Sequence, residues 1–106
     1  MPHKYNARKV SEDGYRFDSK AEHAQYQDLK YRQMAGEIWN LEVHPKYSID
    51  LNGTHICTVI LDFRYQDTRG TIVEDVKGMD TAISRLKRKL VSAVYGISVE
   101  VVKRRA

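Results

Sequence analysis

The chain has little cysteine and proline and no long apolar segment. Cys57 is the one cysteine among 106 residues, which excludes a disulfide framework or a multi-cysteine metal site, because both need paired or clustered thiolates. A lone thiol also favours a reducing compartment. No segment approaches the roughly 18 apolar residues of a membrane helix, and the polar first residues are unlike a secretory signal. We therefore expect a cytoplasmic protein.

The composition is that of one folded domain with a basic surplus. Hydrophobic residues make up 42% of the chain and charged residues 30%, values typical of a globular protein, and 106 residues suit a single core. The 18 basic and 14 acidic residues leave a net charge of +4, which favours a polyanionic partner such as nucleic acid. We expect one domain over residues 1–106, with a flexible basic arm at 1–11 and a basic tail at 103–106.

Turn and capping residues delimit a first helix. Residues 12–14 are typical of a turn, and the alternating aromatics of residues 15–17 indicate a short strand. Ser19 and Glu22 have the spacing of a capping box, and Gly36 is of the type that commonly follows a helix. We therefore expect a helix between Ser19 and Gly36.

Period-two alternation then predicts a set of strands. They are expected from residue 37 up to Pro45, at 47–51, at 55–65 and at 71–77. Asn52-Gly53 predicts a hairpin turn between the second and third strands, and residues 67–70 predict a turn before the fourth. The third strand is apolar on both faces and is expected at the centre of the sheet. The last three strands would then form a meander.

A second helix and a final strand complete the pattern. Asp80 or Thr81 can cap the helix, and Gly96 ends it. Apolar residues recur in it at spacings of three and four, which predicts a buried stripe: Ile83, Leu86, Leu90 and Val94. A strand over 97–102 follows, and the crossover makes it parallel to 71–77. The expected fold class is α/β, with a mixed central sheet, flanking helices and the order α-β-β-β-α-β.

Carboxylates occur where the pattern predicts apolar residues. Asp62 lies within an apolar run of an expected strand, and a buried charge is costly unless something pairs with it. Asp75 and Lys77 lie two residues apart on one strand face, and the turn at 67–70 puts Asp75 nearly opposite Asp62. Because facing like charges destabilise a sheet, we expect a divalent cation such as Mg²⁺ or Mn²⁺ between them. The alternative is strand-end carboxylates that face water or pair with Lys77 and Arg64.

Glu22 is the third candidate ligand. It shares a stripe of the first helix with Tyr26, Leu29 and Gln33, so we expect it to face the sheet and reach the same ion. As the third residue of a capping box it can instead bond the backbone of Ser19. The two roles are compatible.

Histidine and cysteine point to no second site. The histidines lack a metal-ligand spacing and are interpreted as surface or packing residues: His3, His23, His44 and His55. Cys57 is interpreted as an apolar strand residue.

The acidic positions and the lysine resemble the core of the PD-(D/E)xK, or restriction-endonuclease-like, nucleases. The resemblance rests on Asp62, on the run Asp75-Val76-Lys77 and on Glu22 in a preceding helix. The element order of that superfamily is also α-β-β-β-α-β. More narrowly, three segments are similar to short phage-encoded proteins related to Holliday-junction resolvases: Lys4–Ala7, Phe17–Glu22 and Val73–Gly78. The chain departs from the nuclease pattern at Leu61, which stands where a proline commonly precedes the aspartate.

The resemblance implies a metal-dependent endonuclease that hydrolyses phosphodiester bonds. The implied catalytic residues are Glu22, Asp62, Asp75 and Lys77, and the implied ligands of Mg²⁺ or Mn²⁺ are the three carboxylates and the backbone carbonyl of Val76. The ion would polarise the phosphoryl oxygen and lower the pKa of a bound water. Lys77 would orient or deprotonate that water, or neutralise charge at phosphorus. Glu74 is set aside because strand alternation points it to the other face.

Basic residues away from the acidic positions are candidates for DNA contacts, the alternative being a solvated helix face. They are Arg85, Lys87, Arg88, Lys89, Lys103, Arg104 and Arg105. No motif that reads base edges is present, so we expect structure-selective cutting of branched DNA such as Holliday junctions. Symmetric cutting of a junction needs two sites, which predicts a homodimer. The alternative function is a non-catalytic nucleic-acid-binding or assembly module on the same core. If the chain is phage-encoded, the compartment is the cytoplasm of a bacterial host.

Overall fold

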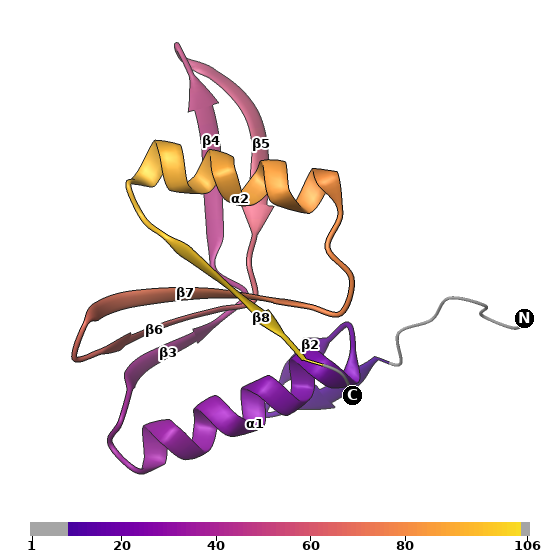
Figure 1. Ribbon diagram of the computed structural model, residues 1–106, viewed down its shortest axis with the longest axis vertical. Helices are drawn as coiled ribbons and strands as arrows, with labels where there is room; N and C mark the ends of the chain where they lie inside the picture. The colour runs from indigo at the N-terminus through magenta and orange to yellow at the C-terminus, as the bar shows by residue number, and fades with distance from the viewer. Residues whose placement is uncertain (1–8, 105–106) are drawn as a thin grey trace, which may run out of the picture.

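The computed structural model describes residues 9–104, and Figure 1 shows how their helices and strands are arranged. The helices are α1 (Lys20–Met34) and α2 (Ala82–Tyr95). The strands are β1 (Val10–Glu12), β2 (Tyr15–Phe17), β3 (Trp39–Val43), β4 (Lys46–Leu51), β5 (Thr54–Ile60), β6 (Phe63–Asp67), β7 (Gly70–Lys77) and β8 (Val99–Lys103). None of the helices within residues 9–104 is long and apolar enough to cross a membrane.

Four strands form a mixed sheet in the order β3-β6-β7-β8. The first two pairings are antiparallel, and β7 and β8 are parallel, as the crossover through α2 requires. Strands β1 and β2 form a separate hairpin, as do β4 and β5. The expected α/β class with a mixed sheet and two helices is confirmed.

The sheet lies between the two helices, and the β4–β5 hairpin extends from it past α2 (Figure 1). Each face has its own apolar cluster. The α1 side buries Phe17, Tyr26, Leu29, Ile38, Phe63, Tyr65 and Ile72. The α2 side buries Tyr47, Ile49, Val59, Leu61, Val73 and Val91. Because side chains alternate along β7, Glu74 leaves the sheet on the α1 side and Asp75 on the α2 side.

The local signals for helix and hairpin ends are confirmed. Ser19 caps α1 and accepts a hydrogen bond from the Glu22 N–H. Thr81 caps α2, and Gly96 ends it at φ 66°. In the β4–β5 turn Asn52 and Gly53 both have positive φ, of 50° and 80°, which is the backbone that an Asn-Gly hairpin turn needs.

The single central strand expected over 55–65 is wrong. The chain forms β5 and β6 instead, with a break at Leu61 and Asp62. Strand β5 pairs only with β4 among the described residues, so no meander links the strands at 47–51, 55–65 and 71–77, and β6 pairs with β3 and β7. One face of β5 is open to solvent, since Ile60 is 55% exposed and Val59 only 2%. Where the hairpin leaves the sheet, the Leu61 N–H donates to the Pro45 carbonyl at 3.0 Å and joins the two ends of the hairpin.

The stripe expected to be buried on α2 is largely exposed. Ile83, Leu86 and Val94 are 61%, 53% and 43% exposed, whereas α2 buries Arg88 and Val91. Placing Arg88 on a solvated basic face was therefore wrong. Its burial is tolerated because carboxylates neutralise the guanidinium, as described below.

The two ends of the chain also differ from expectation. The arm expected at 1–11 lies outside the described residues up to position 8, but Val10 and Ser11 pair with β2 in β1. In the expected tail, Lys103 ends β8, and Arg104 donates to Gln25 Oε1 at 2.9 Å. Arg105 lies outside the described residues.

Candidate metal centre

The centre forms where the β4–β5 hairpin rejoins the sheet. His44 N–H donates to the Asp62 carbonyl at 2.9 Å, and Asp62 N–H donates to the Glu74 carbonyl at 3.2 Å. These backbone bonds fasten the break between β5 and β6 to the end of β3 and to β7. His44 has a φ of 56°, in the left-handed region that residues other than glycine seldom adopt. Asp13, Asn40 and Asn52 also adopt it, and histidine, asparagine and aspartate do so more readily than most residues.

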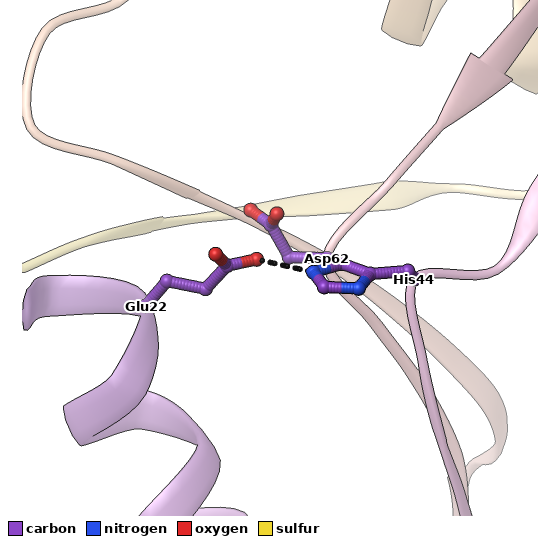
Figure 2. A group of neighbouring side chains, drawn as sticks. All are labelled: Glu22, His44 and Asp62. Carbon is purple, nitrogen blue, oxygen red and sulfur yellow. Dashed lines mark hydrogen bonds and ion pairs between the residues drawn. The ribbon is translucent and has the colours of Figure 1, made fainter. Parts of the chain in front are cut away.

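Three side chains from distant parts of the chain converge there. One ligand atom each of Glu22, His44 and Asp62 lies within 4.8 Å of the others, and Figure 2 shows Glu22 reaching from α1 toward the other two. His44 Nε2 lies 3.1 Å from Glu22 Oε2. The Glu22 side chain is only 6% exposed, and that of His44 is 32% exposed. The group is therefore sheltered at Glu22 and open at the imidazole.

The two carboxylate oxygens of Glu22 have different partners. Oε1 accepts from the Asp18 backbone N–H at 2.9 Å, while Oε2 faces His44. Ser19 Oγ accepts from the Glu22 N–H at 3.1 Å. The capping bond therefore goes to Asp18, one residue before the Ser19 backbone we expected. Capping engages one oxygen, and the other faces His44 outside the capping bond.

Asp62 is partly buried and crowded by other carboxyl groups. Burial, followed by the neighbouring Glu22 carboxylate, raises the pKa of Asp62 to about 7, although the Val76 N–H opposes this rise. That N–H donates to Asp62 Oδ2 at 2.6 Å. The pKa of Asp75 is also raised, first by burial and then by Asp62. Carboxylates this close repel one another when all are ionised, and a bound cation would offset that repulsion.

Asp75 faces Asp62 across the strands, as the turn length predicts. Phe63 pairs with Glu74, so one step along the antiparallel register sets Asp62 opposite Asp75. Asp75 Oδ2 lies 3.5 Å from Lys77 Nζ, and the Asp75 side chain is 7% exposed. The Val76 carbonyl was expected to be a metal ligand, and the contact that Val76 makes with the site is the hydrogen bond from its N–H to Asp62 Oδ2.

Arg88 holds Asp75 in place from α2. Its Nη1 donates to Asp75 Oδ2 at 3.1 Å and to Asp80 Oδ1 at 3.0 Å, and its Nη2 donates to Asp80 Oδ2 at 2.6 Å. The guanidinium is thus buried and paired with Asp75 and Asp80, so Arg88 is no longer a candidate DNA contact. The other α2 candidates, Arg85, Lys87 and Lys89, are exposed, as is Lys103.

Glu74 belongs to a separate buried network on the α1 side. It accepts from Gln25 Nε2 at 2.8 Å and from the Tyr65 hydroxyl at 2.5 Å. Arg104 donates to the same Gln25. The choice of Asp75 over Glu74 by strand alternation therefore agrees with where the two side chains lie.

Sequence reasoning missed His44 and the role of Arg88. His44 was grouped with the other histidines because no spacing links it to Glu22 or Asp62. Its position before Pro45, at a strand end, is the single local feature that sets it apart. Arg88 lies among other basic residues of α2, and no periodic pattern separates it from Arg85 or Lys89.

The described residues thus define an α/β domain that gathers carboxylates and an imidazole at one end of its mixed sheet. The model of a family described as "Protein of unknown function (DUF1064)" matches residues 2–104. The chain belongs to this family. Comparison with the curated proteins and with the solved structures finds no match.

Proposed function

We propose that this protein is a metal-dependent endodeoxyribonuclease that hydrolyses phosphodiester bonds, with a preference for branched DNA such as Holliday junctions. One observation carries the proposal: the Asp62 carboxylate lies between Glu22 on one side and Asp75 on the other, with Lys77 beside Asp75. Such a grouping is unfavourable on its own. A divalent cation relieves the repulsion, and phosphodiester hydrolysis is a reaction that such an ion assists.

The donor set suits a divalent cation. Glu22 and Asp62 offer carboxylate oxygens, and His44 offers an imidazole nitrogen. Oxygen ligands suit Mg²⁺ and Mn²⁺, and the added imidazole favours Mn²⁺ over Mg²⁺. A cation bound there would polarise a phosphoryl oxygen of the substrate and lower the pKa of a bound water.

The chain's own residues supply orientation and charge. Lys77 Nζ, 3.5 Å from Asp75 Oδ2, is placed to orient the attacking water or to neutralise charge at phosphorus. Arg88 fixes the Asp75 carboxylate through the bond at 3.1 Å and is a positioning residue. Val76 N–H orients Asp62 in the same way.

The order of elements supports a restriction-endonuclease-like core. If the β4–β5 hairpin is treated as an insertion, the chain runs α1, β3, β6, β7, α2, β8, which is the order α-β-β-β-α-β. Those four strands are also neighbours in one sheet. His44 and Asp62 flank the insertion, at the points where the hairpin leaves and rejoins the sheet.

The proposed partners are DNA and a second copy of the chain. The net charge of +4 favours a polyanion. A homodimer follows from the two cuts that a junction needs. The exposed α2 stripe of Ile83, Leu86 and Val94 is apolar surface that a second copy would cover.

One observation favours a non-catalytic nucleic-acid-binding or assembly module instead. Asp75 Oδ2 already contacts both Arg88 and Lys77, so this carboxylate is neutralised without a metal ion. In such a module Glu22, His44 and Asp62 would hold the fold together and do no chemistry.

A cleavage assay separates the two functions. Wild-type protein, Asp62→Asn and Asp75→Ala are incubated with supercoiled plasmid and a four-way junction, with Mg²⁺, Mn²⁺ or EDTA. Asp28→Asn is the matched control, since Asp28 is an exposed aspartate on α1. We expect cutting that needs the metal, persists in the control and is lost in both site variants. If no protein cuts any substrate while all still bind it, the nuclease proposal is rejected and the module stands.

A further inference from the structure

A cavity of about 400 Å³ lies beside the candidate metal centre. It is lined by Lys9, Arg16, Asp18, His44, Lys46 and Ile60. The lining comes from both ends of the β1–β2 hairpin and from both ends of the β4–β5 hairpin. Two lining residues touch the centre directly, because His44 Nε2 lies 3.1 Å from Glu22 Oε2 and the Asp18 N–H donates to Glu22 Oε1. The cavity and the centre therefore share a wall.

The charge on this cavity is mostly positive and uncompensated. Lys9, Arg16 and Lys46 are exposed, and within residues 9–104 none of them lies within ion-pairing distance of a carboxylate. Lys30 and Arg64, by contrast, each contact acidic side chains. Within residues 9–104 the α2 cations Arg85, Lys87 and Lys89 also lie outside ion-pairing distance of a carboxylate, so the cavity cations differ from them in bordering a hollow beside the centre. Three unpaired cations around a hollow, against the one carboxylate of Asp18, attract an anionic ligand.

The cavity also offers apolar surface. Ile60 is 55% exposed although it ends a strand whose neighbouring residue, Val59, is buried. A ligand that carries regularly spaced negative charge and has apolar sugar and base surface between the charges fits this lining. A nucleic-acid strand has this chemistry, whereas a small anion would leave Ile60 uncovered.

We propose that this cavity binds the sugar–phosphate backbone of the DNA strand that enters the metal centre. Lys9, Arg16 and Lys46 contact its phosphates, and Ile60 packs against the sugars. This assignment rests on the proposed function for its substrate. The main phosphate contacts are then Lys9, Arg16 and Lys46, and no longer the basic residues of α2. The cavity residues are favoured because they lie beside the Glu22 and Asp62 carboxylates.

Binding measured without metal tests the assignment separately from catalysis. The probe is a fluorescent four-way junction with the matching linear duplex, titrated in EDTA at several salt concentrations, so that no cutting occurs. One variant carries Lys9→Gln, Arg16→Gln and Lys46→Gln together. The matched variant removes three charges from α2 instead, as Arg85→Gln, Lys87→Gln and Lys89→Gln. All six side chains are exposed, so both variants should keep the melting temperature of the wild type.

The salt dependence gives the expected size of the effect. Each phosphate contact contributes a slope of about −0.9 to the log–log plot of affinity against salt on duplex DNA. The cavity variant loses three phosphate contacts, so its slope should be shallower than that of the wild type by about 2.7. It should also bind at least tenfold more weakly at low salt. The slope of the α2 variant should change by less than about 0.9, the contribution of one phosphate contact.

Three results would overturn the assignment. They are an unchanged slope in the cavity variant, an α2 variant that loses as much as the cavity variant, and a wild-type protein that binds neither DNA. If the wild-type protein binds the junction as expected but does not cut it once Mg²⁺ or Mn²⁺ is added, the nuclease proposal fails and the cavity assignment stands.

Discussion

Replacing Asp62 by asparagine should stabilise the metal-free protein at neutral and higher pH. Burial and the Glu22 carboxylate raise the pKa of Asp62 from 3.8 to about 7, so ionisation of this group opposes folding. Below its unfolded pKa the group is protonated in both states and adds nothing. As the pH rises toward the folded pKa, only the unfolded chain releases its proton freely, so the destabilisation grows and is complete above about pH 7.

The size of the effect follows from the pKa. A rise from 3.8 to about 7 corresponds to about 4 kcal/mol at full ionisation, at 1.36 kcal/mol for each pKa unit. Partial exposure reduces this value. Asparagine keeps an oxygen for the Val76 N–H, but the neutral bond is weaker by about 1 kcal/mol. We therefore expect Asp62→Asn to raise the free energy of unfolding by about 2 kcal/mol at pH 8, and to leave it nearly unchanged at pH 4.

Urea denaturation in EDTA measures this directly. Wild type, Asp62→Asn and the control Asp28→Asn are compared between pH 4 and pH 8. The gain should appear only in Asp62→Asn and should increase with pH. An Asp62→Asn protein that is less stable than wild type at pH 8, or equally stable at every pH, would refute the claim that burial and the neighbouring Glu22 carboxylate disfavour ionisation of Asp62.

Further predictions concern α2 and the metal preference. Arg88→Met should lower the free energy of unfolding by about 3 kcal/mol, because it leaves buried carboxylates unpaired, whereas Arg85→Met should change it by less than about 0.5 kcal/mol in the same urea titration. Equal effects would contradict the buried pairing. Leu86→Glu should convert a dimer to a monomer in sedimentation analysis without lowering the melting temperature. Met34→Glu, at a still more exposed apolar residue, should leave the mass unchanged; an unchanged mass for Leu86→Glu would remove α2 from the interface. His44→Ala should weaken Mn²⁺ binding more than Mg²⁺ binding in calorimetry, and unchanged Mn²⁺ affinity in His44→Ala would exclude His44 as a ligand.

Local signals were enough to predict most elements of the fold. Ser19 and Thr81 act as helix caps, and the Asn52-Gly53 turn forms with the expected positive φ values. Each depends on a few neighbouring residues. The facing positions of Asp62 and Asp75 were predictable for the same reason, since a short turn sets the register of the two strands.

The break in the 55–65 segment was not predictable from local pattern. Val59 and Leu61 are buried and Ile60 is exposed, yet all three are apolar, so period-two alternation is hidden in the sequence. The break depends on bonds to a distant segment, from His44 N–H to the Asp62 carbonyl and from Leu61 N–H to the Pro45 carbonyl. Residues so far apart in sequence carry no sign of this pairing.

The orientation of α2 shows a second limit. The apolar stripe with Leu86 predicted the buried face, but the helix turns Arg88 inward instead. Ion pairs with Asp75 and Asp80 allow this, and they connect residues whose contact only the folded chain reveals. Amphipathic periodicity therefore located the helix and misassigned its inner face, which left apolar surface open.

Calorimetric titration of Mn²⁺ tests the central claim most directly. The claim is that Glu22 and Asp62 form a divalent-cation site, and the titration is run on wild type, Glu22→Gln, Asp62→Asn and the control Asp28→Asn. We expect saturable binding in wild type and control and at least tenfold weaker binding in both site variants, a loss of about 1.4 kcal/mol. Equal Mn²⁺ affinity in all four proteins, or no binding in any, would contradict the account.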